Sequence, residues 1–280
     1  MYVVAGPSNP LLSLRIAKKL NARIAKVSFK KFPDGELYVR VEEVKEPVVL
    51  VQGITSNENL IYLFLLLDSL SALDPILVLP YMGYSRQDRE FLKGEAVSIR
   101  MIAKMIEEYV RNVITVNIHS HLAASYFKKL IHIDAMPLIG EYFKNKDVVM
   151  ISPDLGSLER VKVAAETAGC EYDYMEKKRI DAERVEIKPK SLDVKEKEVV
   201  LVDDIISTGG TLIEATKILR LNGARKIVAS CVHAVLASNA LNKLYSSGIT
   251  EVVATDTIER QVSKISVSDL LSLKIEELLK

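Results

Sequence analysis

One thirteen-residue segment, VVLVDDIISTGGT over residues 199–211, constrains the fold of this chain more than any other. Its four leading apolar residues are typical of a parallel strand buried on both faces. Two carboxylates, Asp203 and Asp204, follow the apolar run, and a loop of small residues then opens a helix. Backbone N–H groups at such a helix start bind phosphate. We therefore expect a phosphate site at the loop, with the two acids placed to reach sugar hydroxyls or a magnesium ion.

The loop consists of hydroxyl-bearing and glycine residues: Ser207, Thr208, Gly209, Gly210 and Thr211. An ordinary strand-to-helix turn, with an Asp or a Ser as its N-cap, would also explain the glycine pair. The complete string is more selective than that pair, and it resembles the ribose-5-phosphate-binding loop of the type I phosphoribosyltransferase fold. Phosphoribosyltransferases and ribose-phosphate pyrophosphokinases share this fold. No Lys follows the glycines, which distinguishes the string from a nucleotide P-loop.

Length and charge set the broad class of the protein. The 280 residues suffice for one large or two ordinary α/β domains, and 49% hydrophobic residues allow a substantial core. The 38 Lys and Arg residues nearly balance 37 Asp and Glu residues, which leaves a net charge of +1. No global charge therefore favours nucleic acid or an anionic membrane as a partner. Any anion site must be built locally.

Targeting signals and cysteine spacing indicate the compartment. The N-terminal residues, MYVVAGPSN, read as a short strand without the regions of a signal peptide. The apolar run over 60–67 is interrupted by Asp68 well before membrane-spanning length. Cys170 and Cys231 have no metal-ligand spacing, which favours two thiols in a reducing cytosol. We expect a cytoplasmic protein with no membrane partner.

Strand and helix patterns alternate along the whole chain, which indicates parallel sheets covered by helices. In the first half we expect strands at 2–5, 48–52, 76–79 and 113–118, and helices at about 9–20, 57–73 and 96–110. The second half repeats this plan, with strands at 148–152, 199–203, 227–232 and 252–255 and a helix at 211–221. We infer two similar domains, 1–145 and 146–280, with a final helix at 268–279 that could pack on either. One face of the helix at 96–110 favours a core role, through Met101, Ile102, Met105, Ile106 and Tyr109.

Two further segments of the first half are candidates for ligand binding. Residues 32–36, FPDGE, read as a tight turn opening a β-hairpin, and taken alone they indicate no more than that. Residues 80–89, PYMGYSRQDR, follow a buried strand with a polar loop. Arg86 and Arg89 in this loop could be ordinary surface charges. However, α/β sheets bind ligands just past the carboxyl ends of their strands, and this loop lies there.

Three other polar positions carry both a structural and a functional interpretation. His119, in VNIHSH, ends a strand of the first domain as Asp203 does in the second, although a lone His is usually structural. Asp154, in ISPDLGS, lies at a strand end, where it suits Mg²⁺ or its water shell, the alternative being a helix N-cap. The basic run at 177–179 would ordinarily be a solvated surface. A triphosphate substrate, however, requires cations that arrive and leave with it.

Six strings occur in an order that resembles the ribose-phosphate pyrophosphokinases: FPDGE, PYMGYSRQDR, VNIHSH, ISPDLGS, KKR and VVLVDDIISTGGT. The resemblance spans nearly the whole chain, and the short archaeal-type members of the family match its length best. It implies an α/β protein of two tandem type I phosphoribosyltransferase-type domains, each a central mainly parallel sheet flanked by helices. The first domain is implied to be a degenerate copy on the ATP side, and the second to hold ribose 5-phosphate.

The resemblance also implies an enzyme and a reaction. The family transfers the β,γ-diphosphoryl group of ATP to the anomeric hydroxyl of ribose 5-phosphate. The products, 5-phosphoribosyl 1-diphosphate and AMP, connect the family to nucleotide biosynthesis. Catalysis of this kind consists mostly of alignment and charge neutralisation. Mg²⁺ is the implied cofactor.

Residue roles follow from the same resemblance. The implied catalytic pair is Lys177 and Arg179, and Arg179 also binds ribose 5-phosphate. The implied ATP-binding residues are Phe32, Asp34, Gly35, Glu36, Arg86 and Gln87. The implied ribose-5-phosphate-binding residues are Asp203, Asp204, Ser207, Thr208, Gly209, Gly210 and Thr211. The implied metal-associated residues are His119 and Asp154.

Two consequences are specific to this chain. Hairpin residues of the FPDGE string contact adenine from a neighbouring subunit in the family, which implies a homo-oligomer, at least a dimer. Asn117 stands where many relatives carry Asp, and a neutral amide supplies no charge to a metal. We expect activity to survive this change, because Mg²⁺ commonly keeps several waters.

Two other classes of protein compete with this interpretation. A phosphoribosyltransferase would consume 5-phosphoribosyl diphosphate, and it would lack the ATP-associated FPDGE and RQ segments. A non-catalytic regulatory subunit or ligand sensor could bind the same ligand on this fold. The presence of Lys177, Arg179 and Asp154, with no added basic DNA-binding segment, weighs against the sensor.

Overall fold

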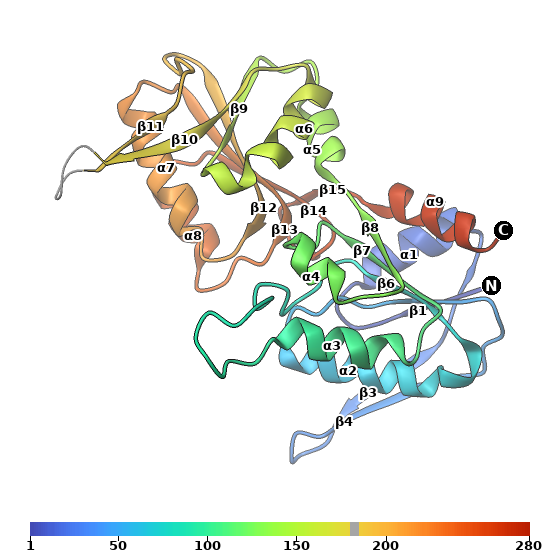
Figure 1. The fold of residues 1–280 in the computed structure, drawn as a ribbon. Coiled ribbons are helices and arrows are strands. Elements are labelled where there is room, and N and C mark those ends of the chain that lie inside the picture. Colours follow the sequence, from blue (N-terminus) through green and yellow to red (C-terminus); the bar gives the residue numbers. More distant parts are fainter. Residues whose placement is uncertain (180–184) are drawn as a thin grey trace. The chain divides into compact units, whose positions relative to one another are not determined.

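The chain folds into two compact units, seen in a computed structural model that describes residues 1–179 and 185–280 (Figure 1). The side chains of residues 177–188 lie outside this description. The first unit comprises Met1–Asp134, Thr257–Glu259 and Ser266–Lys280. The second comprises Ala135–Asp256 and Arg260–Ile265. No helix in the described part of the chain combines the length and the apolar character needed to cross a membrane.

These units differ from a division at residue 145 in three places, one of which is the short segment Thr257–Glu259, which belongs to the first unit. Helix α5 (Met136–Phe143) belongs to the second unit, because it packs on α6 (Leu158–Ala168). The last helix, α9 (Ser268–Leu278), belongs to the first unit, because it packs on α1 (Pro10–Lys19). Both assignments depend on helix–helix contacts between segments separated along the chain, which a hydrophobic pattern does not report.

The first unit is built on a six-stranded sheet in the order β2-β1-β5-β6-β7-β8, with every pairing parallel. The strands are β1 (Tyr2–Ala5), β2 (Arg23–Ile24), β5 (Val48–Val51), β6 (Ile76–Leu79), β7 (Asn112–Val116) and β8 (Leu130–Ile133). Helices α2 (Asn57–Ser69) and α3 (Ser98–Glu107) cover one face of the sheet, and α1 and α9 cover the other (Figure 1). The short η1 (Ser71–Leu73) and α4 (His121–Ser125) complete this unit. Because both faces are covered, β5 and β6 are buried along their whole length.

The second unit is built on a seven-stranded sheet in the order β11-β10-β9-β12-β13-β14-β15. Its strands are β9 (Val148–Ser152), β10 (Tyr172–Arg179), β11 (Val185–Pro189), β12 (Glu198–Ile206), β13 (Lys226–Ala234), β14 (Glu251–Thr255) and β15 (Ser263–Ile265). Only the β10–β11 pairing among these is antiparallel. Helices α5 and α6 lie on one face, and α7 (Gly210–Leu221) and α8 (Ala240–Ser246) on the other (Figure 1). The short η2 (Leu155–Ser157) precedes α6.

The two units repeat one plan. In each sheet five strands follow one another in chain order, β1-β5-β6-β7-β8 in the first and β9-β12-β13-β14-β15 in the second. Each unit also inserts an antiparallel hairpin between the first and second of these strands. The hairpin is β3 (Val27–Lys31) with β4 (Leu37–Val41) in the first unit, and β10 with β11 in the second. The internal repeat inferred from the sequence is therefore present in the topology.

The predicted core face of α3 is partly wrong. Ile102 and Ile106 are buried, but the exposed fraction is 65% for Met101, 38% for Met105 and 36% for Tyr109. The buried stripe of the helix runs through Ile99, Ile102, Ala103 and Ile106. A helix advances about 100° per residue, so residues 101 and 105 point away from that stripe. The two methionines and the tyrosine are thus exposed and do not form a core layer.

Candidate active site

The loop 207–211, where the sequence predicts a phosphate site, leads into a helix that has no capping side chain. Strand β12 ends at Ile206, and α7 begins at Gly210 after a three-residue loop. Gly209 is the N-cap residue of α7 with φ +76°, and no side chain accepts a hydrogen bond at this cap. A Cβ atom at position 209 would lie 3.0 Å from Cδ2 of Leu244, so both the backbone conformation and the available space favour glycine. The first N–H groups of α7 therefore remain available to an anion.

The corresponding helix start in the first unit is closed by its own side chains. Ser56 is the N-cap residue of α2, and its hydroxyl accepts a 3.1 Å hydrogen bond from the N–H of Asn59. The amide of Asn59 in turn donates to Thr55 Oγ1 at 2.6 Å, and Gln52 Nε2 donates to the carbonyl of Asn59 at 3.0 Å. Of the two equivalent helix starts, only that of α7 lacks side-chain capping. This asymmetry in capping distinguishes the two copies of the helix start.

The two acids that follow the apolar run of β12 face different partners. Asp203 Oδ1 accepts hydrogen bonds from Ser157 Oγ and from the N–H of Asp204, both at 2.8 Å. Asp204 is buried and forms an ion pair with Arg160, with 3.2 Å between Oδ2 and Nη1. The pKa of Asp203 is raised to about 7, mainly by burial and next by the adjacent carboxylate of Asp204. Asp203 therefore changes charge near neutral pH, whereas the positive charge of Arg160 compensates Asp204.

Asp154 lies beside the phosphate loop. Its carboxylate is exposed and caps η2, since Oδ1 accepts a 3.1 Å hydrogen bond from the N–H of Ser157. The capping role that the sequence left as an alternative is thus present. A hollow of about 400 Å³ is lined by Pro153, Asp154, Met175, Gly210, Thr211, Glu214, Ala215 and Ile218. The fold therefore brings Asp154 and the start of α7 to one concave surface.

The predicted basic pair lies on the strand that borders this hollow. Lys177 and Arg179 are the sixth and eighth residues of β10, and their backbone pairs with β11. The side chains of both residues lie outside the described part of the structure. Met175, two residues before Lys177, lines the hollow. The root of the hairpin is therefore adjacent to Asp154 and to the phosphate loop.

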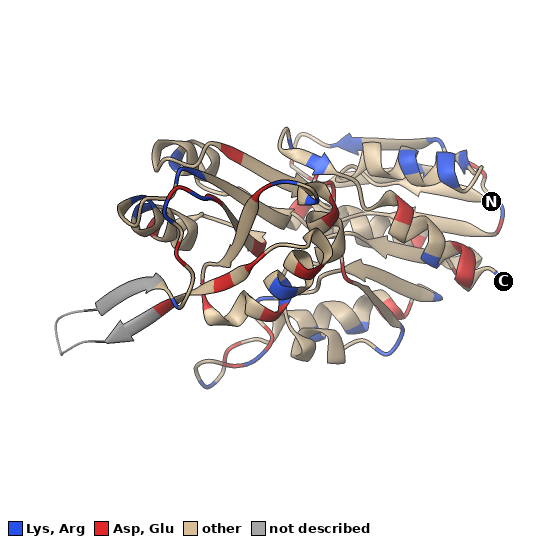
Figure 2. Cartoon of the chain, turned by 90° about the horizontal axis from the view of Figure 1, so that it is seen from above, with Lys and Arg blue, Asp and Glu red and all other residues tan. Residues whose placement is uncertain are grey.

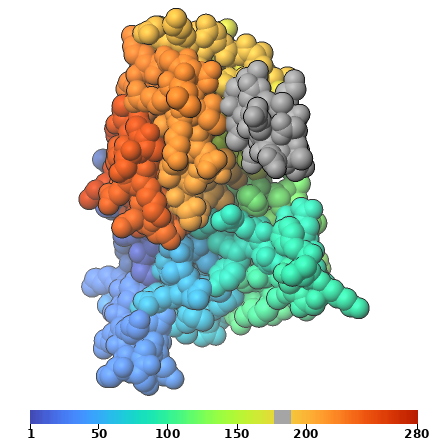
Figure 3. Space-filling model, turned by 90° about the vertical axis from the view of Figure 1, so that its left-hand side faces the viewer, coloured from blue at the N-terminus to red at the C-terminus, as the bar shows by residue number. Residues whose placement is uncertain are grey.

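In the first unit the FPDGE string forms the tight turn predicted for it. The N–H of Phe32 donates to the carbonyl of Glu36 at 2.8 Å, and the N–H of Gly35 donates to the carbonyl of Phe32 at 2.9 Å. Gly35 has φ +96°, a conformation that glycine adopts without a Cβ penalty. Asp34 Oδ1 accepts the N–H of Glu36 at 3.2 Å. The β3–β4 hairpin projects from the unit in Figures 1 and 3, and Phe32 at its tip is 47% exposed.

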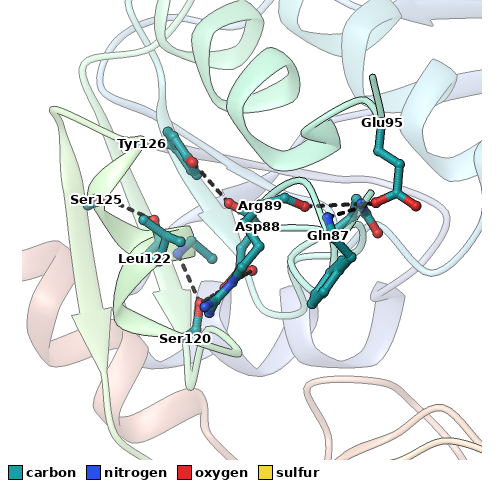
Figure 4. A network of polar contacts seen from close by, with 10 residues as sticks. Gln87, Asp88, Arg89, Glu95, Ser120, Leu122, Ser125 and Tyr126 are labelled. Carbon is teal, nitrogen blue, oxygen red and sulfur yellow. Dashed lines mark hydrogen bonds and ion pairs between the residues drawn. The ribbon is translucent and has the colours of Figure 1, made fainter. Parts of the chain in front are cut away.

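The loop between β6 and α3 carries Arg86 and Gln87. Arg86 is exposed, and Gln87 Nε2 donates to Glu95 Oε2 at 3.3 Å and to the carbonyl of Arg89 at 3.1 Å (Figure 4). Glu95 Oε2 also accepts the N–H groups of Phe91 and Leu92, and these bonds lower the pKa of Glu95. The carboxylate of Glu95 thus orders the loop from within and orients the Gln87 amide.

Asp88 joins this loop to the segment that follows β7. The side chain is buried, and Oδ2 accepts a 2.6 Å hydrogen bond from Ser120 Oγ, while Oδ1 lies 3.0 Å from Arg89 Nε (Figure 4). The hydroxyl of Tyr126 donates to the backbone carbonyl of Asp88 at 2.9 Å. The pKa of Asp88 is lowered mainly by its hydrogen bond from Arg89 and next by its hydrogen bond from Ser120. Ser120 also caps α4 and directly follows His119, so Asp88 connects the Arg86–Gln87 loop to the His119 loop.

Asn117 has a structural partner, which explains an amide at this position without a metal ion. The side-chain amide of Asn117 donates a 2.7 Å hydrogen bond to Asp134 Oδ1. The backbone at Asn117 has φ +36°, in the left-handed region where Asn is more common than most residues. An amide that donates to a carboxylate supports the local turn at the end of β7, which is a structural role.

Sequence reasoning missed the residues that hold the functional side chains in place. These are Ser157 and Arg160 beneath the two acids of β12, and Asp88, Glu95 and Ser120 in the first unit. Asp173, at the root of the β10–β11 hairpin, is another. Asp88, Ser120 and Ser157 lie inside the strings PYMGYSRQDR, VNIHSH and ISPDLGS, but their own roles were not assigned, and Arg160, Glu95 and Asp173 lie outside the six strings. Their one local signal was a polar side chain close to a strand end.

Charge is distributed in agreement with a locally built anion site. Figure 2 shows Lys and Arg interspersed with Asp and Glu over both units, in the described part of the chain. An anion site at the start of α7 would therefore have to use backbone N–H groups, and not a strongly basic surface.

The two sheets share one plan, and they differ in whether the helix start after the second strand of that plan is open to an anion or capped by side chains. These features define a protein with tandem phosphoribosyltransferase-type domains. Residues 1–109 match the N-terminal domain of ribose phosphate pyrophosphokinase, and residues 126–263 match the phosphoribosyl transferase domain. The chain belongs to the ribose-phosphate pyrophosphokinase family.

Individual relatives agree with this assignment. The chain is 58% identical to ribose-phosphate pyrophosphokinase 2 of Archaeoglobus fulgidus, over 98% of this chain and 100% of that one. It is 41% identical to the ribose-phosphate pyrophosphokinase of Methanothermobacter thermautotrophicus, over 96% and 98%. The structure of phosphoribosylpyrophosphate synthetase from Mycobacterium smegmatis superposes with a TM-score of 0.85 at 26% identity, over 99% and 98%. The predicted family and fold class are confirmed. The chain is an enzyme that forms 5-phosphoribosyl 1-diphosphate and AMP from ATP and ribose 5-phosphate.

Proposed function

We propose that the second unit binds ribose 5-phosphate and that the first unit supplies the ATP-binding residues. The open start of α7 is the observation that carries this proposal. Its N–H groups have no capping side chain, whereas Ser56 caps the equivalent helix α2. The 5-phosphate would bind at Ser207, Thr208, Gly209, Gly210 and Thr211, where backbone N–H groups and the helix dipole favour negative charge.

The sugar would then extend toward the end of β12. Asp203 is partly exposed and accepts hydrogen bonds, so its carboxylate is suited to the ribose hydroxyls. Asp204 is buried against Arg160, and we propose that it contributes mainly by its charge and by holding the strand end. Fixing the hydroxyls orients the anomeric oxygen for in-line attack on the β-phosphorus of ATP.

ATP would be held by two loops that both belong to the first unit, with the hairpin turn supplied by a second copy of the chain. The hairpin turn contributes Phe32, Asp34, Gly35 and Glu36, and the loop after β6 contributes Arg86 and Gln87. Phe32 presents an exposed ring suited to stacking on adenine, and Arg86 presents an exposed guanidinium suited to phosphate. The bonds from Glu95 and Asp88 support the second loop.

Lys177 and Arg179 would neutralise charge on the transferring diphosphoryl group, and Arg179 would also contact ribose 5-phosphate. The antiparallel β10–β11 hairpin carries both residues. Removal of one such preorganised charge typically lowers turnover by about 10²–10³-fold.

The donor set of the chain fits Mg²⁺ bound largely by substrate phosphates. Among the described residues no three His, Cys, Asp or Glu side chains form a metal cage. Asp154 uses one oxygen in its cap and is exposed, so the second oxygen is available to an ion or to its water shell. Mg²⁺ usually takes one or two carboxylates together with phosphates and waters. We propose that His119 and Asp154 are the metal-associated residues and that the bound ion would neutralise phosphate charge.

We further propose that the enzyme works as a homo-oligomer, at least a dimer. The ATP-side residues Phe32, Asp34 and Glu36 lie at the tip of a projecting hairpin, a geometry suited to reaching a second copy (Figure 3). Helix α3 also presents apolar residues to solvent, with Met101 65% exposed. Sedimentation velocity of the wild type should give at least a dimer, and a fully active monomer would contradict this proposal.

A cytoplasmic location agrees with the substrates of the family and with two free cysteines, Cys170 and Cys231. The central test of the proposed function is nucleotide-resolved turnover. AMP should form from ATP only when both ribose 5-phosphate and Mg²⁺ are present. Binding of ribose 5-phosphate without release of AMP would identify a sensor in place of an enzyme.

A further inference from the structure

We propose that Asp173 is a positioning residue that sets the direction in which the β10–β11 hairpin leaves the sheet. By doing so it would place Lys177 and Arg179, a role that rests on the proposed function of that pair. Asp173 belongs to none of the motifs that identify the family in this sequence. The proposal arises from its contacts in the structure.

The carboxylate of Asp173 is bonded to both ends of the hairpin. The side chain is buried, with 5% of the residue exposed. Oδ1 accepts a 2.9 Å hydrogen bond from the N–H of Tyr174, on the outgoing strand. Oδ2 accepts the N–H of Ser191 at 2.8 Å and the N–H of Leu192 at 2.9 Å, just after the returning strand ends. One carboxylate therefore fastens the beginning of the hairpin to its end.

This clamp lies where the hairpin loses the support of the sheet. Residues 172–174 of β10 pair in parallel with β9, the last pair being Tyr174 with Ser152. From Met175 onward β10 pairs instead with β11, beginning with the Met175–Pro189 pair. In the described part of the chain, β10 from Met175 onward pairs with β11 and no longer with β9. The direction of this part of β10 relative to β9 is determined at the root.

A carboxylate is suited to this position and an amide is not. Three backbone donors converge on the two oxygens of Asp173, and both oxygens accept. An Asn side chain has one acceptor oxygen, and its NH₂ group would face a backbone donor. A buried N–H would then lose its acceptor. Tyr174 and Lys190 add a neutral connection, because the N–H of Lys190 donates to the carbonyl of Tyr174 at 3.1 Å. The hairpin should therefore persist in an Asn variant but with a less defined direction.

A small change at the root becomes a large change at the basic pair. Lys177 lies four residues beyond Asp173, which corresponds to roughly 13 Å along an extended strand. A tilt of about 5° at the root would displace position 177 by roughly 1 Å. A misplacement of that size can reduce turnover by about 10²-fold. Met175, between Asp173 and Lys177, lines the hollow together with Asp154 and Gly210. The same tilt would therefore change the shape of the proposed substrate site.

The test compares Asp173→Asn with a matched control in the same loop, Asp193→Asn. Asp193 also accepts a backbone N–H, from Lys195 at 2.9 Å, but that bond is exposed and does not reach β10. We expect Asp173→Asn to lower kcat by roughly 10–100-fold. The Kd for ribose 5-phosphate should change by a much smaller factor, because Arg179 is the one hairpin residue proposed to contact that ligand. Backbone amides of β10 and β11 should exchange with deuterium faster, and those of β9 and β12 should not. Asp193→Asn should match the wild type in every readout.

Two results would overturn the proposal. One is a kcat of Asp173→Asn within about twofold of the wild type. The other is a loss of ribose 5-phosphate binding in proportion to a lowered melting temperature, which would indicate a merely structural role. If Asp173→Asn does not fold, Asp173→Glu keeps the charge with a longer side chain. It should show the same split between kcat and binding, and an unchanged kcat would contradict the clamp.

Lys177→Ala separates this inference from the proposed function. If Lys177→Ala loses turnover but Asp173→Asn does not, the clamp is wrong and the catalytic role of the hairpin stands. If Lys177→Ala keeps wild-type turnover, the catalytic role is wrong. The exchange rates of β10 and β11 in Asp173→Asn then still decide whether the clamp exists.

Discussion

Ser157 Oγ donates a 2.8 Å hydrogen bond to Asp203 Oδ1 and joins the segment before α6 to the end of β12. Three residues later, Arg160 forms the ion pair with Asp204. The segment that carries Asp154 therefore also holds both acids of the proposed ribose site. A substitution in this segment should therefore change the affinity for the sugar as well as that for the metal ion.

Replacement of Ser157 by Ala should weaken ribose 5-phosphate binding by roughly 3–10-fold, because Asp203 loses a hydrogen bond that orients it. Isothermal titration at constant pH measures the change. Ser247→Ala is the matched control, since its hydroxyl donates to the carbonyl of Leu244 in the same unit. An unchanged Kd in Ser157→Ala would show that the hydroxyl does not orient Asp203 for the sugar.

Replacement of Arg160 by Met should lower the free energy of unfolding by about 3 kcal/mol, because Asp204 would remain buried without its cation. Chemical denaturation at pH 8 measures this loss. Lys162→Met removes an exposed helix ion pair with Glu166 and should cost less than about 1 kcal/mol. Equal effects of the two variants would contradict a special role for the Arg160–Asp204 pair.

Replacement of Gly209 by Ala should lower the free energy of unfolding by roughly 2 kcal/mol and abolish measurable ribose 5-phosphate binding. An L-residue is strained at φ +76°, and the added Cβ would press on Leu244. Gly169→Ala is the control, with φ +73° and open space around its Cβ. That variant should lose about 1 kcal/mol and still bind the ligand. Retained binding in Gly209→Ala would argue against this loop as the phosphate site.

The titration of Asp203 should make stability depend on pH. Because its folded pKa, about 7, lies above the ordinary value of 3.8, the folded state binds the extra proton between these values. This contribution favours the folded state at low pH and is lost as the pH rises through about 7. Asp203→Asn should therefore gain stability relative to the wild type as the pH rises from about 4 to about 7, measured by denaturant unfolding. A constant difference over this range would contradict the raised pKa.

Replacement of Asp88 by Asn should lower kcat/KM for ATP by about 10-fold, because the loop that carries Arg86 and Gln87 loses its charge-assisted bonds to Arg89 and Ser120. Steady-state kinetics with ribose 5-phosphate at saturation measures the effect. Glu90→Gln alters an exposed carboxylate that accepts the N–H of Gly94 in the same loop and should have little effect. If both variants behave alike, Asp88 does not support the ATP loop.

Much of the fold followed from local patterns in the sequence. Continuous apolar runs predicted β5, β6 and β12, because a strand buried on both faces admits few polar residues. Turn chemistry predicted the hairpin around Gly35 and the helix start at Gly209, because these backbone conformations favour glycine. Each such signal lies within a few residues, so it can be read without knowing what surrounds it.

Other features were decided only by the tertiary structure. Asp204 forms an ion pair with Arg160, and α9 packs on α1. Met101 points outward from α3. These outcomes depend on which segments meet across the sheet and on which side of a helix is covered. The chain itself thus determined the long buried strands, the turns at Gly35 and Gly209 and the family, but not the short edge strands β2, β8 and β15 or the β10–β11 hairpin. Only packing between distant segments decided which side chains hold the proposed site residues in place, because hydrogen bonds and ion pairs form between neighbours in space and not in sequence.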